Sequence, residues 1–190
     1  NREPDPYAEV LGGLAFGRNI SAAPIRPSIL GSWRNKIRQP AINVDLNYEE
    51  VFDNHLIANP KKWALVYAPR LLWRKLTGLR TRGNALITGL LKGCFDAGVE
   101  VWLEPPVSSL KKDARQINGV TVEYEGHELD IFVSGGVILD SGGFEWNMEM
   151  MAKYFPGPVE WTASPRTNTG DGHRMALEVG APLDRMDQAL

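Results

Sequence analysis

The chain has 190 residues, the length of one good-sized domain or two small ones, and its 43% hydrophobic content supports a buried core and argues against disorder. A formal net charge of −2 without a large basic patch makes nucleic acid an unsuitable partner. The single cysteine, Cys94, excludes an internal disulfide and a thiolate metal cluster, and the three scattered histidines lack metal-ligand spacing, so we expect no metal site.

The sequence shows no apolar run long enough to span a bilayer and no signal-peptide pattern at its start. We therefore expect a cytoplasmic protein. The first residue is Asn1 rather than Met, and the proline-rich opening does not resemble a natural start. We expect the chain to be an internal piece of a larger protein.

Residues 1–77 are punctuated by prolines, which predicts an irregular, partly helical region. One helix is predicted to begin at Asn47. A clearer one begins at Asn59, with Pro60 at its first position, because asparagine caps helices and proline suits the first turn. Pro69 should kink or split that helix.

Aromatic and basic side chains recur along this second helix. Trp63 and Trp73 are predicted to pack in a core or an interface. A basic cluster follows, and we interpret it as a solvated helix face rather than a binding patch; it consists of Arg70, Arg74, Lys75, Arg80 and Arg82.

The middle of the chain alternates between helical and strand-like patterns. A helical stripe of apolar residues runs from Asn84 to Cys94, which we expect to pack in the core, and ends at Gly98. Residues 99–103 then alternate as a short strand, which together with the helix forms the usual layer of an α/β sheet. Further strands are predicted at 107–110, in a β-hairpin over 120–133, and at 136–140, where a continuous apolar run indicates a strand buried on both faces.

Two helices are predicted near the end of the chain. An amphipathic helix spans 147–154, and a second is capped by Asp171 and ends at Gly180.

The first glycine motif is Ser141-Gly142-Gly143, directly after the predicted buried strand. Glycines at the carboxyl edge of a sheet let the backbone pass close to a flat or anionic ligand. The alternative is a tight turn that needs glycine for its backbone angles alone.

The second glycine motif is Asn168-Thr169-Gly170-Asp171-Gly172, which opens a helix. Amide groups at a helix start bind anions or polar ligand edges, and Asn168 and Thr169 add side-chain hydrogen bonds. A carboxylate there repels an anion, so Asp171 is interpreted as a helix cap or as an acceptor for a ligand hydroxyl.

Several catalytic signatures are absent from the sequence. No Gly-x-Gly-x-x-Gly lies between a strand and a helix, which disfavours a nicotinamide-linked Rossmann enzyme. No nucleophile triad and no carboxylate pair on one element can be recognised. We therefore predict no catalytic residue within these 190 residues.

In this order and spacing, three motifs resemble the flavin-binding domain of fumarate reductases and 3-ketosteroid dehydrogenases. They are Glu104-Pro105-Pro106-Val107, Ser141-Gly142-Gly143-Phe144-Glu145-Trp146-Asn147, and Asn168 to Gly172. The resemblance covers about the last 110 residues well. It implies an α/β fold: part of a Rossmann-like FAD-binding domain with a β-hairpin or meander insertion and an irregular helical N-terminal region. The resulting domain division is 1–77 and 78–190.

The resemblance also implies a role for each motif. Val107 corresponds to a backbone contact with the adenine end of FAD. Ser141, Gly142 and Gly143 correspond to a turn beside the cofactor, although Asp140-Ser141 stands where the family has Ala-Thr. The cofactor-binding residues closest to the flavin are Asn168, Thr169, Gly170, Asp171 and Gly172.

The function implied is that of an FAD-dependent oxidoreductase that transfers hydride at a carbon–carbon bond next to a carbonyl. Its expected partners are FAD and a small carbonyl substrate, which the complete protein would bind with the help of domains outside this chain. The segments Phe-Glu-Trp-Asn and Pro-Gly-Pro resemble the ketosteroid branch of the family, which favours a ketosteroid over fumarate as the substrate. Since the family's pyrophosphate-binding glycines are absent, we expect the chain alone to be inactive and to bind FAD weakly or not at all. The alternative is a non-catalytic α/β interaction module whose glycine-rich turns are purely structural.

Overall fold

The computed structural model describes residues 21–39, 44–47, 50, 59–155 and 157–187. The chain divides into two compact units, Asn1–Val101 and Trp102–Leu190, which are described separately. The predicted helix at Asn47 lies mostly outside the described residues. The predicted domain division at residue 77 stays a prediction.

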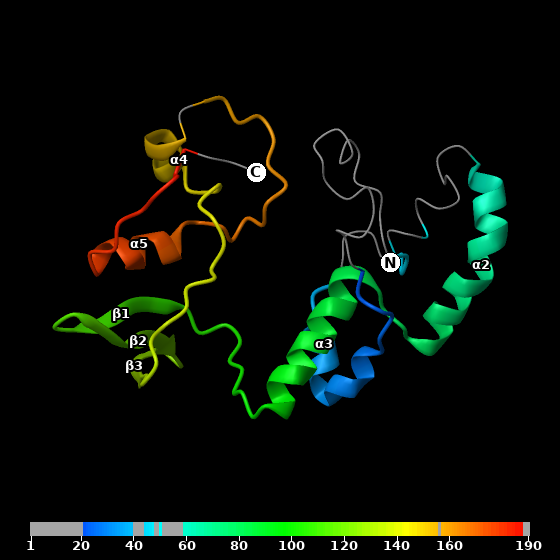
Figure 1. Cartoon of the computed structure of the whole chain (residues 1–190), viewed down its shortest axis with the longest axis horizontal. Helices are drawn as coiled ribbons and strands as arrows, with labels where there is room; N and C mark the ends of the chain where they lie inside the picture. The colour runs from blue at the N-terminus through cyan, green and yellow to red at the C-terminus, as the bar shows by residue number, and fades with distance from the viewer. Residues whose placement is uncertain (1–20, 40–43, 48–49, 51–58, 156, 188–190) are drawn as a thin grey trace, which may run out of the picture. The chain divides into compact units, whose positions relative to one another are not determined.

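The first unit contains η1 (Pro27–Lys36), α2 (Pro60–Thr77) and α3 (Arg82–Asp96) (Figure 1). Helix α2 begins after Asn59 as predicted and ends at Gly78, whose φ of 68° allows its N–H to reach the carbonyls of Arg74 and Lys75. The predicted split of the helix at Pro69 is wrong, since one helix runs through it, and the alternative, a kink there, stays a prediction. The buried residues Trp63 and Tyr67 before Pro69 and Arg74 after it hold the helix on both sides and offset the one hydrogen bond that proline removes.

One face of α2 forms the core of this unit. Trp63 and Tyr67 pack with Leu46, and their rings lie 5.0 Å apart. Trp63 is therefore a core residue, as predicted. Trp73 is 61% exposed, so the same prediction for Trp73 is not met within this unit.

A buried ion pair closes the core beneath α2. The Glu50 carboxylate accepts hydrogen bonds from Arg74 Nη1 at 2.6 Å and Nη2 at 2.8 Å, and from Arg70 Nη1 at 2.8 Å. Arg80 pairs with Asp45 at 2.7 Å. The interpretation of this basic cluster as a solvated face was therefore wrong, because Arg74 is only 6% exposed and three of its members bind carboxylates.

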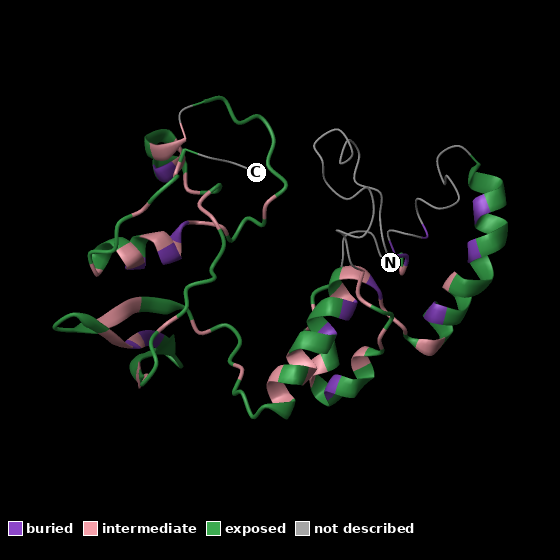
Figure 2. Cartoon of the chain, in the orientation of Figure 1, coloured by how far each residue is buried: buried purple, intermediate pink, exposed green. Residues whose placement is uncertain are grey.

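Helix α3 packs against η1, where the rings of Trp33 and Phe95 meet edge to face at 5.2 Å. Its end near Gly98, at φ 75°, agrees with the prediction. Its buried face differs from the predicted one: Ala85 and Thr88 are buried, whereas Leu90 in the predicted stripe is 59% exposed. Figure 2 shows that most of the described surface of α3 is exposed or half-buried.

The second unit contains β1 (Val107–Asp113), β2 (Gln116–Tyr124), β3 (His127–Phe132), α4 (Met148–Tyr154) and α5 (Asp171–Glu178). The strands form an antiparallel meander in the order β1-β2-β3, which agrees with the predicted strand at 107–110 and the predicted hairpin. Thr121 faces Asp130 across β2 and β3, and its hydroxyl donates to that carboxylate at 2.8 Å.

Two predicted strands are absent from the structure. Residues 99–103 carry no regular structure, and neither do residues 136–140, where Ile138 is 94% exposed instead of buried. A strand forms only where a neighbouring strand pairs with its backbone groups. Within the described ranges, no other segment pairs with either of these two.

Candidate functional site

Two loops of the second unit lie against each other. We call residues 139–147 the first glycine loop and residues 164–172 the second. The amide of Gly170 donates to the carbonyl of Gly143 at 3.0 Å, and the amide of Trp146 donates to the carbonyl of Asn168 at 3.0 Å. The two motifs singled out in the sequence therefore meet in space, as the prediction of a shared site required.

Asn147 joins the two glycine loops to helix α4. Its side-chain oxygen accepts from the amide of Met150 at 3.0 Å and so caps the helix, while its Nδ2 donates to the carbonyl of Thr169 at 2.9 Å. Sequence reasoning placed Asn147 at the start of a helix but did not give it the second contact. The sequence signal for this contact is an asparagine that stands both at a helix start and next to a glycine motif.

The glycines are required by this loop–loop contact. Gly142 and Gly170 both have φ of 78°, a conformation that other residues adopt only with strain. A Cβ on Gly142 would lie 2.5 Å from Asn168 Oδ1, and one on Gly170 would lie 2.5 Å from the Met150 sulfur. A Cβ on Gly172 would collide with the Ser141 hydroxyl. The turn interpretation is thus realised here, whereas close approach to a ligand stays a prediction.

Asp171 does not cap α5, contrary to one of its two predicted roles. Gly170 occupies the cap position, and Asp171 follows as the first helical residue. Its carboxylate accepts from the Thr169 hydroxyl at 2.8 Å and from Arg174 Nη2 at 2.6 Å. These two hydrogen bonds, the one from Thr169 first, hold the pKa of Asp171 below its ordinary value. The carboxylate is therefore ionised at neutral pH, and Arg174 offsets part of its charge.

A groove of about 490 Å³ opens where the two loops meet the first turn of α5. Its lining combines backbone and small side chains and consists of Leu139, Asp140, Ser141, Gly142, Gly143, Gly172, His173, Ala176 and Leu183. The amides of Gly172 and His173 lie in the first helical turn, where the α-helix supplies no carbonyl partner. The residues that line the groove thus include the two whose amides lack an intrahelical partner and a serine, and these are donor types that suit a polar ligand edge.

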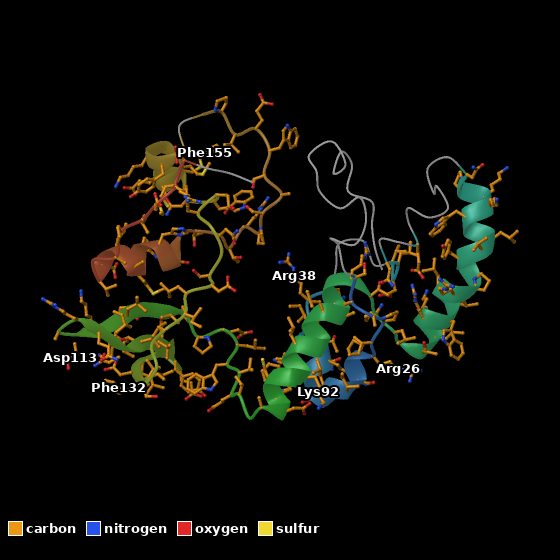
Figure 3. All side chains as sticks on the ribbon, viewed as in Figure 1. Arg26, Arg38, Lys92, Asp113, Phe132 and Phe155 are labelled. Carbon is orange, nitrogen blue, oxygen red and sulfur yellow. The ribbon has the colours of Figure 1, made fainter. Side chains whose placement is uncertain are left out.

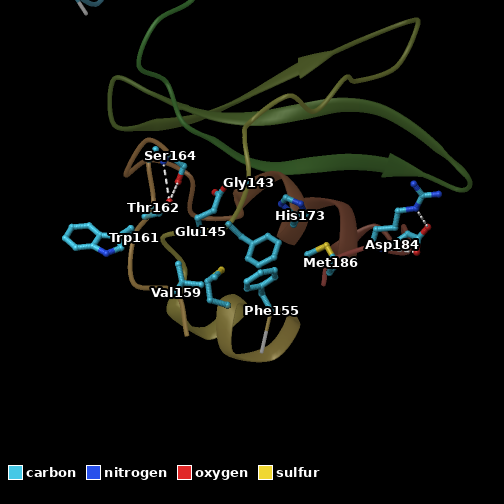
Figure 4. Close-up of a pocket in the computed structure, with 14 residues that line it drawn as sticks. Gly143, Glu145, Phe155, Val159, Trp161, Thr162, Ser164, His173, Asp184 and Met186 are labelled. Carbon is cyan, nitrogen blue, oxygen red and sulfur yellow. Dashed lines mark hydrogen bonds and ion pairs between the residues drawn. The ribbon is translucent and has the colours of Figure 1, made fainter. Parts of the chain in front are cut away.

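A second cavity of about 610 Å³ shares Gly143 and His173 with the groove, and Figure 4 shows its lining. Phe144, Glu145, Phe155 and His173 are among the residues that line it. The rings of Phe144 and His173 meet edge to face at 5.5 Å. His173 therefore contributes to both cavities. Sequence reasoning overlooked this residue, although its place directly after Gly172 in the first helical turn was a usable signal.

The structure brings together eight of the nine residues predicted to bind the cofactor. Ser141, Gly142, Gly143 and Gly172 line the groove, whereas residues 168–170 and Asp171, the first residue of α5, are not part of its lining. Val107 lies elsewhere, at the start of β1, where it pairs with Val122 and is not part of the groove lining. A binding role for these residues remains a prediction.

No helix within the described part of the chain has both the length and the apolar content needed to cross a membrane.

Comparison with known proteins identifies the family. A family model described as an FAD binding domain matches residues 7–190. The 3-oxosteroid 1-dehydrogenase of Mycobacterium tuberculosis is 34% identical over 202 residues, which cover 97% of this chain and 36% of that protein. The 4-oxocyclohex-2-ene-1-carboxylate 5-dehydrogenase of Sinomonas cyclohexanicum is 37% identical over 207 residues, covering 96% and 34%.

A solved structure agrees with the sequence comparisons. The 3-ketosteroid Δ1-dehydrogenase of Sterolibacterium denitrificans, in complex with 1,4-androstadiene-3,17-dione, superposes with a TM-score of 0.85 at 27% identity, over 100% of this chain and 37% of that one. The chain thus spans about a third of the length of the relatives it matches. The predicted resemblance, the α/β FAD-binding fold and FAD as the cofactor are confirmed. The chain belongs to the FAD-binding domain family.

Proposed function

We propose that the two glycine loops form part of the FAD site of an oxidoreductase that transfers hydride at a carbon–carbon bond next to a carbonyl. The groove at which the loops meet carries this proposal, because it joins both predicted motifs in one cavity of about 490 Å³. The dehydrogenases of Mycobacterium tuberculosis and Sinomonas cyclohexanicum match nearly the whole chain, which supports this class of reaction.

The residues of the groove suit a flavin cofactor. Glycines keep the wall flat, and the amides of Gly172 and His173 together with the Ser141 hydroxyl supply hydrogen-bond donors. When bound, FAD accepts or donates the hydride. The part of this chain is to hold and orient the cofactor through these donors and to keep its own loops fixed through Asn147.

The rest of the function lies with segments that this chain does not contain. We propose a ketosteroid-type substrate, since 3-oxosteroid 1-dehydrogenases are among the relatives that match nearly the whole chain. We also propose a cytoplasmic location, in keeping with the single cysteine. The chain by itself is expected to be inactive and to bind FAD weakly, because it lacks a glycine fingerprint for the pyrophosphate.

A chimera tests the proposal. The corresponding third of the Mycobacterium tuberculosis 3-oxosteroid 1-dehydrogenase is replaced by this chain, and the purified product is examined for a flavin absorbance band and for oxidation of a 3-ketosteroid with a dye as electron acceptor. We expect both signals. A chimera that folds, by circular dichroism and gel filtration, but carries no flavin contradicts the FAD proposal and favours the structural interaction module.

A second chimera serves as a control. In it, Gly172 is replaced by valine, whose side chain would displace Ser141 and fill the groove. We expect this chimera to fold but to lose flavin, whereas a Gly157→Ala chimera, with nothing within 4 Å of the added Cβ, is expected to retain it.

A further inference from the structure

Asp140 is the acidic side chain of the groove at which the two glycine loops meet. Among the described residues that line this groove, Asp140 and His173 have titratable side chains, and none is a lysine or an arginine. Leu139, Ala176 and Leu183 supply its apolar part. A concave surface lined in this way repels anions and suits a neutral ligand.

Two arginines lie near the groove in the sequence, and each is paired with an aspartate. Arg174 Nη2 binds the Asp171 carboxylate at 2.6 Å. Arg185 Nε lies 3.8 Å from the Asp184 carboxylate, in the segment that follows α5. Each pair is close to neutral, so neither arginine adds a net positive charge beside Asp140.

The lysine of β1 that contacts α5 is engaged at the far end of that helix. Lys112 Nζ donates to the Val179 carbonyl at 2.6 Å. Val179 follows the last turn of α5 and lies about 10 Å along the helix axis from Gly172, beyond the Debye length of about 8 Å at physiological salt. Figure 3 shows Asp113, the residue after Lys112, on the same side of the unit as the last turn of α5. Lys112 therefore does not offset the charge in the groove.

The polar groups of the groove match hydroxyls. The amides of Gly172 and His173 lack intrahelical partners, and Ser141 contributes a hydroxyl. His173 Nδ1 is buried and meets no hydrogen-bond partner within the part of the chain that the structure describes. The Asp140 carboxylate, in contrast, only accepts. A ligand hydroxyl both donates and accepts and can therefore pair with groups of both kinds, whereas a phosphate presents mainly acceptor oxygens.

We propose that Asp140 selects the part of the flavin cofactor that this groove holds, namely the uncharged, hydroxyl-bearing ribityl chain, and excludes phosphate. This role depends on the proposed function, because it assigns one part of FAD to the groove already described. The carboxylate accepts a hydrogen bond from a ribityl hydroxyl, and its charge opposes a phosphate. In water, a phosphate within about 6 Å of a carboxylate is disfavoured about two- to fivefold, depending on the salt concentration. Asp140 is therefore a specificity-determining residue.

Riboflavin and FMN test the proposal because they differ by one phosphate. Each flavin is titrated with the full chain. Flavin fluorescence anisotropy gives the Kd, and the amide resonances of Gly142 and Gly172 show whether the flavin lies at the groove. We expect riboflavin to bind about two- to fivefold more tightly than FMN at low salt. The ratio of the two Kd values should approach one at about 1 M salt, where the Debye length is about 3 Å.

Three variants separate the charge of Asp140 from its hydrogen bond, and circular dichroism checks that each one folds. Asp140→Asn keeps an acceptor oxygen but removes the charge, so the two flavins should bind equally, with riboflavin weakened less than about threefold. Asp140→Leu, of similar size, removes both and should weaken riboflavin about tenfold. Asp113→Asn removes the same charge from an exposed position at the end of β1 and should preserve the preference for riboflavin.

Two results would overturn the role of Asp140. One is FMN binding as tightly as riboflavin at low salt, and the other is a preference for riboflavin that survives Asp140→Asn. If both flavins shift the glycine loops without discrimination, the proposed function stands and the role of Asp140 fails. If neither flavin shifts these loops, both fail.

Discussion

The contact between the glycine loops makes Gly170→Ala a quantitative test of the site. An alanine there meets two costs that can be separated. A φ of 78° is a left-handed conformation, which costs an alanine about 1–2 kcal/mol. The new methyl group would also lie 2.5 Å from the Met150 sulfur and 3.0 Å from Phe144 Cβ, and relieving such overpacking costs about 1–3 kcal/mol.

Two other glycines of the same unit isolate the two terms. Gly126 has φ of 79° and nothing within 4 Å of an added Cβ, so Gly126→Ala reports the backbone term alone. Gly135 has no such φ and equally open surroundings, so Gly135→Ala should be neutral or slightly stabilising. The expected losses in the free energy of unfolding are therefore about 2–5 kcal/mol for Gly170→Ala and about 1–2 kcal/mol for Gly126→Ala.

Urea denaturation followed by circular dichroism measures these differences, provided that the m-values of the variants agree. The amide resonances of Gly143 and Met150 report whether the loops separate locally. If Gly170→Ala costs no more than Gly126→Ala and leaves these resonances unmoved, then the loops are not in the contact described, and the argument for a joint site fails.

The other predictions concern the contacts that hold each unit together. Arg74→Met should lower the free energy of unfolding by about 3–5 kcal/mol because it strands the buried Glu50, whereas Arg70→Met, with its side chain 56% exposed, should cost less than about 1 kcal/mol; urea titration distinguishes them. Burial acts to raise the pKa of Glu50, but hydrogen bonds from Arg74, the Asn47 amide and Arg70 hold it below its ordinary value. Its contribution to stability is therefore present above about pH 4.3 and is lost as the pH falls through the lower folded pKa, a dependence that Glu50→Gln should remove from acid-unfolding curves. Asn147→Ala should cost about 1–2 kcal/mol and loosen the second glycine loop, seen as faster amide exchange at Gly170.

Features set by a few neighbouring residues could be predicted from the sequence. Local backbone preferences decide three of these features: the start of α2 at Asn59-Pro60, the end of α3 near Gly98, and the hairpin turn at Glu125-Gly126. The predicted hairpin and the helices α4 and α5 could also be predicted, because their patterns likewise lie within a few neighbouring residues.

Features that depend on distant partners could not be predicted. The apolar run at 136–140 has the composition of a buried strand, but a strand needs a neighbour, and Ile138 lies exposed. The burial of Arg74 likewise depends on Glu50, which is 24 residues away in the sequence. The periodicity of the sequence therefore does not indicate that these two residues pair.

The candidate site was predicted in part. The order of its glycine motifs indicated that both belong to one cavity, and the hydrogen bond from Gly170 to Gly143 bears this out. Nothing in the pattern showed that His173 borders two cavities, or that the Asn147 amide reaches Thr169, because both depend on how α4 and α5 are placed.

The central claim, that the glycine loops line a flavin site, is tested most directly by amide resonances of the full chain titrated with FMN and, separately, with ADP at millimolar concentrations. We expect FMN to shift residues 141–143, 172 and 173, and ADP to leave them unmoved. FMN-dependent shifts in other parts of the second unit, with none in these loops, would contradict the claim.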